Sequence, residues 1–228
     1  MNHTHHRLLI VGLVSALMGC GSATDTAKPV PAGLTVMEAA AEDAYDQSLA
    51  QHFDDVTIDA QMIDEAWTAF RSEAADDGAP TDDLTAMDAA VAGFVAAAMD
   101  PTDALVLGRS ANAVSGAMDE LYRLYDEPAP PEVLALDYLG REVVLDGRQG
   151  DLSGASTHID ALESTFATIR AALEAAGGGH VATEYEASIA AMRADVANND
   201  LTTLETDTNV GLELVDRMEG AFTKASKG

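Results

Sequence analysis

The chain has 228 residues, of which 12 are lysine or arginine and 39 are aspartate or glutamate, so its formal net charge is −27. This balance excludes nucleic acid as a partner, because contacts with phosphates need clustered basic residues, and it excludes electrostatic attraction to an anionic membrane surface. The single cysteine, Cys20, excludes a disulfide, a thiolate metal site and a c-type haem attachment within one chain.

The first segment of the chain predicts export from the cytoplasm. Residues 1–7 are polar with one firm positive charge at Arg7, and the apolar run Leu8–Met18 follows. This run is too short to span a bilayer as a helix, which takes about 20 residues. Its length is typical of the apolar core of a secretory signal peptide. We therefore expect residues 1–19 to be removed on maturation.

The end of this run resembles the lipobox of bacterial lipoproteins, with Leu17, Gly19 and Cys20 in the positions that the signal requires. The resemblance implies cleavage before Cys20 and acyl chains, such as palmitate, on that residue, which would attach the protein stably to a membrane. Gly21 rather than aspartate follows the cysteine. Under the sorting rule of some Gram-negative bacteria, this implies the outer membrane, facing the periplasm or the cell surface. The alternative is an ordinary signal peptide cut near residues 21–23, which would leave a soluble protein.

The acidic composition has two open explanations. A dense carboxylate surface keeps proteins soluble at high salt, where the charges are screened. A GC-rich genome also favours alanine, aspartate and arginine codons. Neither explanation indicates a function.

The first half of the body is expected to form two long helices. Residues 20–34 are rich in small residues, threonine and proline and predict a flexible tether. A capping box at Thr35 and Glu38 then opens a helix. Apolar residues recur at alternating spacings of four and three over residues 36–75, which predicts one long amphipathic helix. Gly78 is expected just beyond its end.

The next helix, over residues 81–125, is expected to be interrupted at Pro101, which has no amide hydrogen to donate. Asp100 is expected to cap the fresh start that follows. The phase of the apolar residues shifts by two positions across this interruption. We therefore predict a kink in the second helix.

The second half repeats this plan. A third helix is expected over residues 132–173, and its early part is apolar on most sides and is predicted to be deeply packed. A capping box at Thr183 and Glu186 opens a fourth helix, which is interrupted at Asn199 and runs to about residue 222.

The apolar positions of the two halves, residues 35–127 and 132–224, superpose at an offset of 97 to 99 residues. We infer a duplicated helical hairpin. The alternative is that any two amphipathic hairpins align through their common period. The predicted fold is all-α, an up-down-up-down four-helix bundle of long helices over residues 35–224, with kinks in the second and fourth helices.

The level at which the second and fourth helices break, called here the kinked waist, is the one place where a site is expected. In antiparallel hairpins, Pro101 and Asn199 would each face a group of histidine and aspartate side chains. The alternative is a pair of solvated kinks with surface acids beside them. The candidate ligands for a metal ion at this level are His52, Asp55, Asp103, His158, Asp160 and Asp200.

Arg141 lies within the apolar part of the third helix, one turn after Asp137. An ion pair with Asp137 at i,i+4 spacing is expected to compensate the charge of Arg141. The alternative is an arginine that faces a ligand, since a guanidinium binds carboxylates well.

The sequence contains no nucleophile elbow, phosphate-binding loop, dinucleotide fingerprint or Glu-x-x-His pair. It therefore favours a non-enzymatic protein without a cofactor. The leading hypothesis is an envelope-anchored lipoprotein whose acidic helical body binds or scaffolds a protein partner in the cell envelope. The alternative is a helical bundle that binds a small ligand or a divalent metal ion at the kinked waist.

Overall fold

The computed structural model describes residues 28–227, and this part of the chain is all-α, as predicted, with no strand. It folds into eight helices, which are α1 (Ala32–Leu49), α2 (Phe53–Asp76), α3 (Thr81–Ala98), α4 (Ala104–Tyr122), α5 (Pro131–Gln149), α6 (Leu152–Ala175), α7 (Gly179–Asn198) and α8 (Leu201–Ser226).

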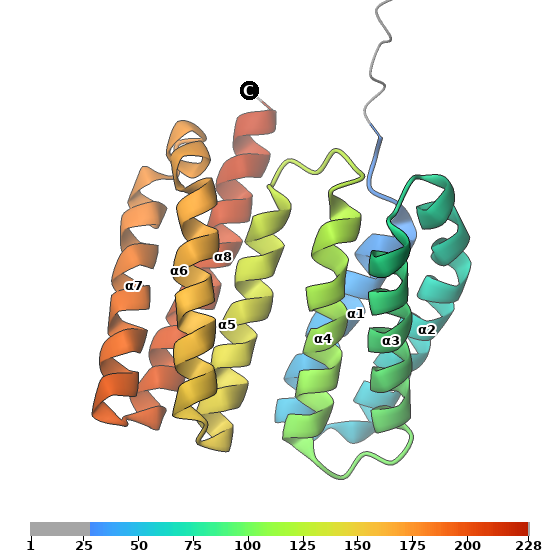
Figure 1. Ribbon diagram of the computed structural model, residues 1–228, viewed down its shortest axis with the longest axis horizontal. Coiled ribbons are helices and arrows are strands. Elements are labelled where there is room, and N and C mark those ends of the chain that lie inside the picture. Colours follow the sequence, from blue (N-terminus) through green and yellow to red (C-terminus); the bar gives the residue numbers. More distant parts are fainter. Residues whose placement is uncertain (1–27, 228) are drawn as a thin grey trace, which may run out of the picture.

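The helices form two up-down-up-down sets of four that stand side by side (Figure 1). Helices α1 to α4 surround one apolar core and α5 to α8 surround another. The two sets meet where α4 packs against α5. Helix α5 also packs on α6 and α8, so it is covered on most sides, as predicted for the early part of the third helix.

The prediction of a single bundle of four long helices is wrong. The helix expected over residues 36–75 is two helices, α1 and α2, and the helix expected over residues 132–173 is also two, α5 and α6. At Gln51 (φ 62°) and Gly150 (φ 77°) the backbone takes a left-handed conformation, and the chain reverses direction there.

The apolar spacing does not reveal these reversals. Leu49 and Phe53 lie on either side of the first turn but keep the spacing of four that a continuous helix would have. Two successive helices that bury one face each carry the same period, so a turn of a few residues can leave the pattern in phase.

The predicted kinks at Pro101 and Asn199 are also complete chain reversals. Asp103, rather than Asp100, caps α4 by accepting hydrogen bonds from the amides of Leu105 and Val106. Asn199 has a positive φ of 56°, and Asp200 then caps α8. All of these turns lie at one end of the molecule, so the level predicted as a kinked waist is an end of the structure (Figure 1).

The helix starts also differ from the predicted capping boxes. Helix α1 begins at Ala32, three residues before Thr35, and α7 begins at Gly179, before Thr183. Glu38 does not cap α1 because its carboxylate accepts a hydrogen bond from the Tyr122 hydroxyl. Gly78, with φ 102°, follows the end of α2 as predicted.

The two sets of helices correspond in order and in position. Helix α5 begins 99 residues after α1, and α6 begins 99 residues after α2, matching the offset seen in the apolar pattern. Helices α2 and α6 both have 24 residues.

The chain enters the described structure beside the loop between α4 and α5. The carbonyl oxygen of Lys28 accepts a hydrogen bond from the Asp126 amide (2.8 Å), and the Lys28 ammonium pairs with Asp77 (2.5 Å). The Tyr125 hydroxyl donates to the other oxygen of Asp77 (2.7 Å). These contacts hold the segment before α1 against the end of the first set of helices.

The expected signal peptide, Cys20 and most of the expected tether lie outside the described residues. Within residues 28–227, no helix has the length and apolar character needed to cross a membrane.

Candidate functional site

Three groups of polar residues lie along α5, close to where the two sets of helices meet. One surrounds Arg141, the second lines a pocket at the end where the chain enters, and the third lies toward the opposite end of α5. Buried polar and charged groups are costly unless they are paired, so each group needs an explanation.

Arg141 on α5 connects the two sets of helices. It pairs with Asp137 one turn earlier (2.5 Å), which confirms the predicted i,i+4 pair, and with Glu42 of α1 (3.0 Å). Its guanidinium also lies 5.4 Å from the centre of the Tyr45 ring. Only 10% of its side chain is exposed. Arg141 therefore serves as a buried ionic link between the first and second halves.

Asp137 is the other buried member of this group. Burial raises the pKa of its carboxyl, and Glu42 and Asp216 add to this effect, while Arg141 opposes it. The Tyr45 hydroxyl and the Nη1 atom of Arg141 are buried without a hydrogen-bond partner among the described residues. This group links the two halves of the structure but leaves two buried polar atoms without hydrogen-bond partners among the described residues.

A pocket with a volume of about 240 Å³ opens where α1, α8 and the loop between α4 and α5 meet; we call it the junction pocket. Tyr122 and the carboxyl groups of Glu38, Glu127 and Glu219 contribute its main polar surface. None of the described residues that line it is basic. Its remaining lining residues are Thr35, Ala129, Pro130, Pro131, Val133, Leu134 and Thr223.

The carboxyl groups of the junction pocket have raised pKa values. Desolvation raises the pKa of Glu38, although the hydrogen bond from Tyr122 partly opposes this. Desolvation also raises the pKa of Glu127. Glu219 is exposed as a residue, but desolvation of its carboxyl and the nearby charge of Glu38 raise its pKa to about 7. The carboxylate forms of these groups are therefore disfavoured, and no described lining residue supplies a compensating positive charge.

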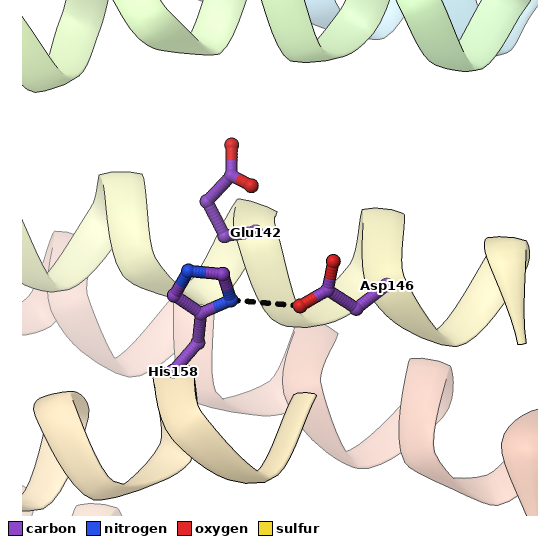
Figure 2. Close-up of side chains that lie close together, drawn as sticks. All are labelled: Glu142, Asp146 and His158. Atoms are coloured by element: carbon purple, nitrogen blue, oxygen red, sulfur yellow. Dashed lines mark hydrogen bonds and ion pairs between the residues drawn. The ribbon is translucent and has the colours of Figure 1, made fainter. Parts of the chain in front are cut away.

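The third group joins Glu142 and Asp146 of α5 with His158 of α6; we call it the His158 cluster (Figure 2). Glu142 and Asp146 are one helical turn apart and are both buried. The Nδ1 atom of His158 lies 2.7 Å from Oδ2 of Asp146. Potential ligand atoms of the three side chains all lie within 4.8 Å of one another.

Local backbone features bring α6 close to this end of α5. Gly150 reverses the chain, and the side chain of Asp151 caps α6. A Cβ atom on Gly154 would lie only 2.6 Å from Oδ2 of Asp146. The absence of a side chain at Gly154 therefore allows the Asp146 carboxylate to lie against α6, within reach of His158.

Helix α4 completes the surroundings of the His158 cluster. Arg109 pairs with Oε2 of Glu142 and with Oδ1 of Asp146 (2.8 Å). The Nδ2 atom of Asn112 donates to Oε1 of Glu142 (2.9 Å) and to the carbonyl oxygen of Tyr138 (3.0 Å). The two carboxylates of the cluster are thus held by one guanidinium and one amide from α4.

The structure does not bring the six metal-ligand candidates predicted from the sequence together into two groups. Asp103 and Asp200 cap helices, and Asp160 pairs with Arg193 (2.6 Å). His52 contacts Gln47 (2.7 Å) beside the exposed Asp55. Within residues 28–227, the one group of three potential metal ligands contains His158 but none of the other five candidates.

Sequence reasoning missed Glu142 and Asp146, which are the partners of His158. A signal was present, because both are charged residues within a segment predicted to be deeply packed, and buried carboxylates need partners. Their spacing of four also places them on one face of a helix. The contact of these two carboxylates with His158 depends on the turn at Gly150, which the prediction of one continuous helix did not include.

The chain as a whole was compared with protein-family models, curated proteins and solved structures, and no match was found.

Proposed function

We propose that this chain is a lipid-anchored protein of the bacterial cell envelope that acts as a non-enzymatic binding module, and that its junction pocket binds a primary ammonium group. The resemblance of residues 17–20 to a lipobox supports the anchor. The chemistry of the junction pocket supports the ligand class.

The observation that carries the proposal is a partly apolar pocket with three carboxyl groups and no basic lining residue among those described. Desolvated carboxylates are unfavourable unless a positive charge compensates them. A primary ammonium group supplies that charge together with three hydrogen-bond donors. A short apolar group beside the amine would pack against Val133 and Leu134.

A free amine and a lysine side chain share this chemistry. The envelope partner is therefore either a small organic amine or a protein that presents a lysine to the pocket. Two titrations distinguish these sources, one with the free amine and one with a peptide that contains a single lysine among uncharged residues. The source that binds more tightly is the preferred ligand.

The ligand class can be tested by calorimetry on the full chain purified in detergent. Phenethylamine is expected to bind at least about tenfold more tightly than 2-phenylethanol or 3-phenylpropanoate, because one charge-assisted hydrogen bond contributes about 1.5–3 kcal/mol. Its affinity should rise from pH 6 to pH 8, since Glu219, with a pKa of about 7, becomes ionised over this range.

Two single substitutions are compared in this test. One removes a carboxyl group inside the pocket, and the other, the control, removes a carboxyl group outside it. Glu219→Gln should lower the affinity for phenethylamine by about tenfold and flatten its pH dependence. Glu213→Gln removes an exposed carboxylate of the same helix that does not line the pocket and should have little effect. Equal affinities for the amine and the alcohol would contradict the proposal.

Anchoring is tested separately at Cys20. Cys20→Ser should move the protein from the membrane fraction to a soluble or unprocessed form, because serine offers no thiol for the lipid. Fractionation and mass spectrometry of the mature amino terminus measure this. Membrane association of the wild-type protein with an unmodified Cys20 would exclude the lipid anchor, and separation of the envelope membranes tests the outer-membrane assignment.

A further inference from the structure

The His158 cluster has the composition of a transition-metal site and lies apart from the junction pocket. An imidazole with two carboxylates is a ligand set suited to Zn²⁺ and similar divalent ions. Glu142 and Asp146 project from adjacent turns of α5 and His158 faces them from α6 (Figure 2). Three ligands from two packed helices define one face of a coordination shell.

The distances are compatible with binding after a small closure. Potential ligand atoms of the three side chains lie within 4.8 Å of one another. In a tetrahedral zinc shell with bonds of about 2.0–2.1 Å, two ligand atoms are roughly 3.3 Å apart. The His158 ring already lies against Asp146, whereas the Glu142 carboxylate points away from both (Figure 2). Rotation of the flexible Glu142 side chain would have to supply this difference.

The surroundings already orient the two carboxylates. Arg109 and Asn112 hold Oε2 and Oε1 of Glu142, and Arg109 holds Oδ1 of Asp146. Ligating carboxylates in metal sites are commonly held by such outer hydrogen bonds. The contact that an ion would replace is the one between Oδ2 of Asp146 and Nδ1 of His158. The two carboxylates share a single guanidinium, that of Arg109.

A second observation points to a missing hydrogen-bond donor. Asn112 is fully buried, and its Oδ1 atom has no partner among the described residues. Its Nδ2 atom donates to Glu142 and to the Tyr138 carbonyl, both of which are acceptors, so the amide orientation is determined. This unpaired acceptor belongs to a side chain that contacts Glu142, and a bound water molecule would supply the donor that it needs.

The first half provides an internal comparison. At an offset of 99 residues, the positions of Glu142, Asp146 and His158 correspond to Asp43, Gln47 and Asp59 on α1 and α2. These three positions of the first half therefore hold two carboxylates and an amide, and the nearby His52 contacts the amide of Gln47 rather than a carboxylate. Among the corresponding positions, only those of the second half combine a histidine with two acids, and this indicates which half would bind a transition metal.

We propose that Glu142, Asp146 and His158 bind one divalent transition-metal ion of the zinc class, with Arg109 and Asn112 orienting the carboxylates. This site is separate from the junction pocket and does not depend on the ammonium ligand. Mg²⁺ and Ca²⁺, which prefer shells made only of oxygen atoms, are excluded as the preferred ions.

The test is a titration of the full chain, purified in detergent and freed of metal with a chelator, with Zn²⁺ by calorimetry. One ion should bind per chain, and an excess of Mg²⁺ should not compete. His158→Ala should weaken binding by about 100-fold or more, because it removes the only nitrogen ligand. His52→Ala is the matched control, since it removes a histidine at the corresponding end of the first half and should leave the affinity unchanged.

Two further measurements keep the test decisive. His158→Gln retains a polar side chain near Asp146 and should also lose tight binding. Circular dichroism of both variants shows whether either one has a folding defect. X-ray absorption at the zinc edge should show one imidazole nitrogen together with oxygen ligands. Absence of stoichiometric binding, unchanged binding in both His158 variants, or loss of binding in His52→Ala alone would overturn the proposal.

Discussion

Replacing Arg141 with alanine is expected to lower the free energy of unfolding by about 3–5 kcal/mol, the usual cost of breaking a buried ion pair from one side. The variant leaves Asp137 buried without its cation and removes the contacts of Arg141 with Glu42 and Tyr45. A loss of this size is a large fraction of the stability of an ordinary domain, about 5–15 kcal/mol. Urea unfolding followed by helical circular dichroism measures it.

Two comparisons separate the buried charge from general effects of losing an arginine. Arg148→Ala removes a more exposed pair with Glu205 and should cost no more than about 1 kcal/mol. The double change Asp137→Leu with Arg141→Met should recover most of the lost stability, because it removes both buried charges. The explanation fails if the double variant is as unstable as Arg141→Ala.

The melting temperature should fall as the pH rises from 5 to 8. Burial raises the pKa of Asp59 to about 6, with Asp43 contributing, and it also raises the pKa of Asp137. Desolvation raises the pKa of Glu219 to about 7. At pH 5 these groups keep a proton in the folded state that the unfolded chain has mostly released. Their contribution to stability is therefore lost as the pH rises through the folded-state pKa values.

The expected loss is at least about 3–6 °C. Asp59 alone has a folded-state pKa about one unit above pH 5, one pKa unit corresponds to about 1.4 kcal/mol, and about 1 kcal/mol moves the melting temperature of such a domain by about 2–4 °C. Thermal melts followed by circular dichroism at pH 5, 6, 7 and 8 measure it. Asp59→Asn should flatten the dependence, whereas Asp64→Asn, an exposed change on the same helix, should not.

A second control separates burial from the repulsion of a chain with net charge −27. At 1 M NaCl, surface repulsion is screened over about 3 Å, while the desolvation of buried carboxyls persists. The pH dependence should therefore be reduced by salt but not abolished. A melting temperature that stays constant or rises between pH 5 and pH 8 would contradict the assignment of raised pKa values to Asp59, Asp137 and Glu219.

Sequence patterns predicted the features of this fold that depend on near neighbours along the chain. The all-α class and the pair between Asp137 and Arg141 both follow from helical spacing, and both are confirmed. The number of helices does not follow from spacing. Gln51 adopts a left-handed conformation without glycine or proline beside it, so the turn between α1 and α2 has no strong local signal.

The candidate sites were less predictable because they depend on contacts between distant segments. His158 was among the candidates chosen from the sequence, but its partners lie on α5, and their contact depends on the turn at Gly150 and the lack of a side chain at Gly154. The junction pocket brings Glu38 together with Glu219 from the other end of the chain. No periodicity within one helix can show that two such carboxyl groups share a pocket.

The contacts of Lys28 have a consequence for how the molecule would stand on a bilayer. Lys28 is held beside Asp126 and Asp77. The chain enters at the same end of the helices as the loop between α4 and α5 (Figure 1), and this loop lines the junction pocket. With a lipid on Cys20, residues 21–27 could reach at most about 25 Å, given about 3.3–3.6 Å for each extended residue. That end would then be held within this distance of the lipid headgroups. The His158 cluster lies about 18 Å farther along α5 at 1.5 Å per residue, so it is attached farther from the anchor than the junction pocket is.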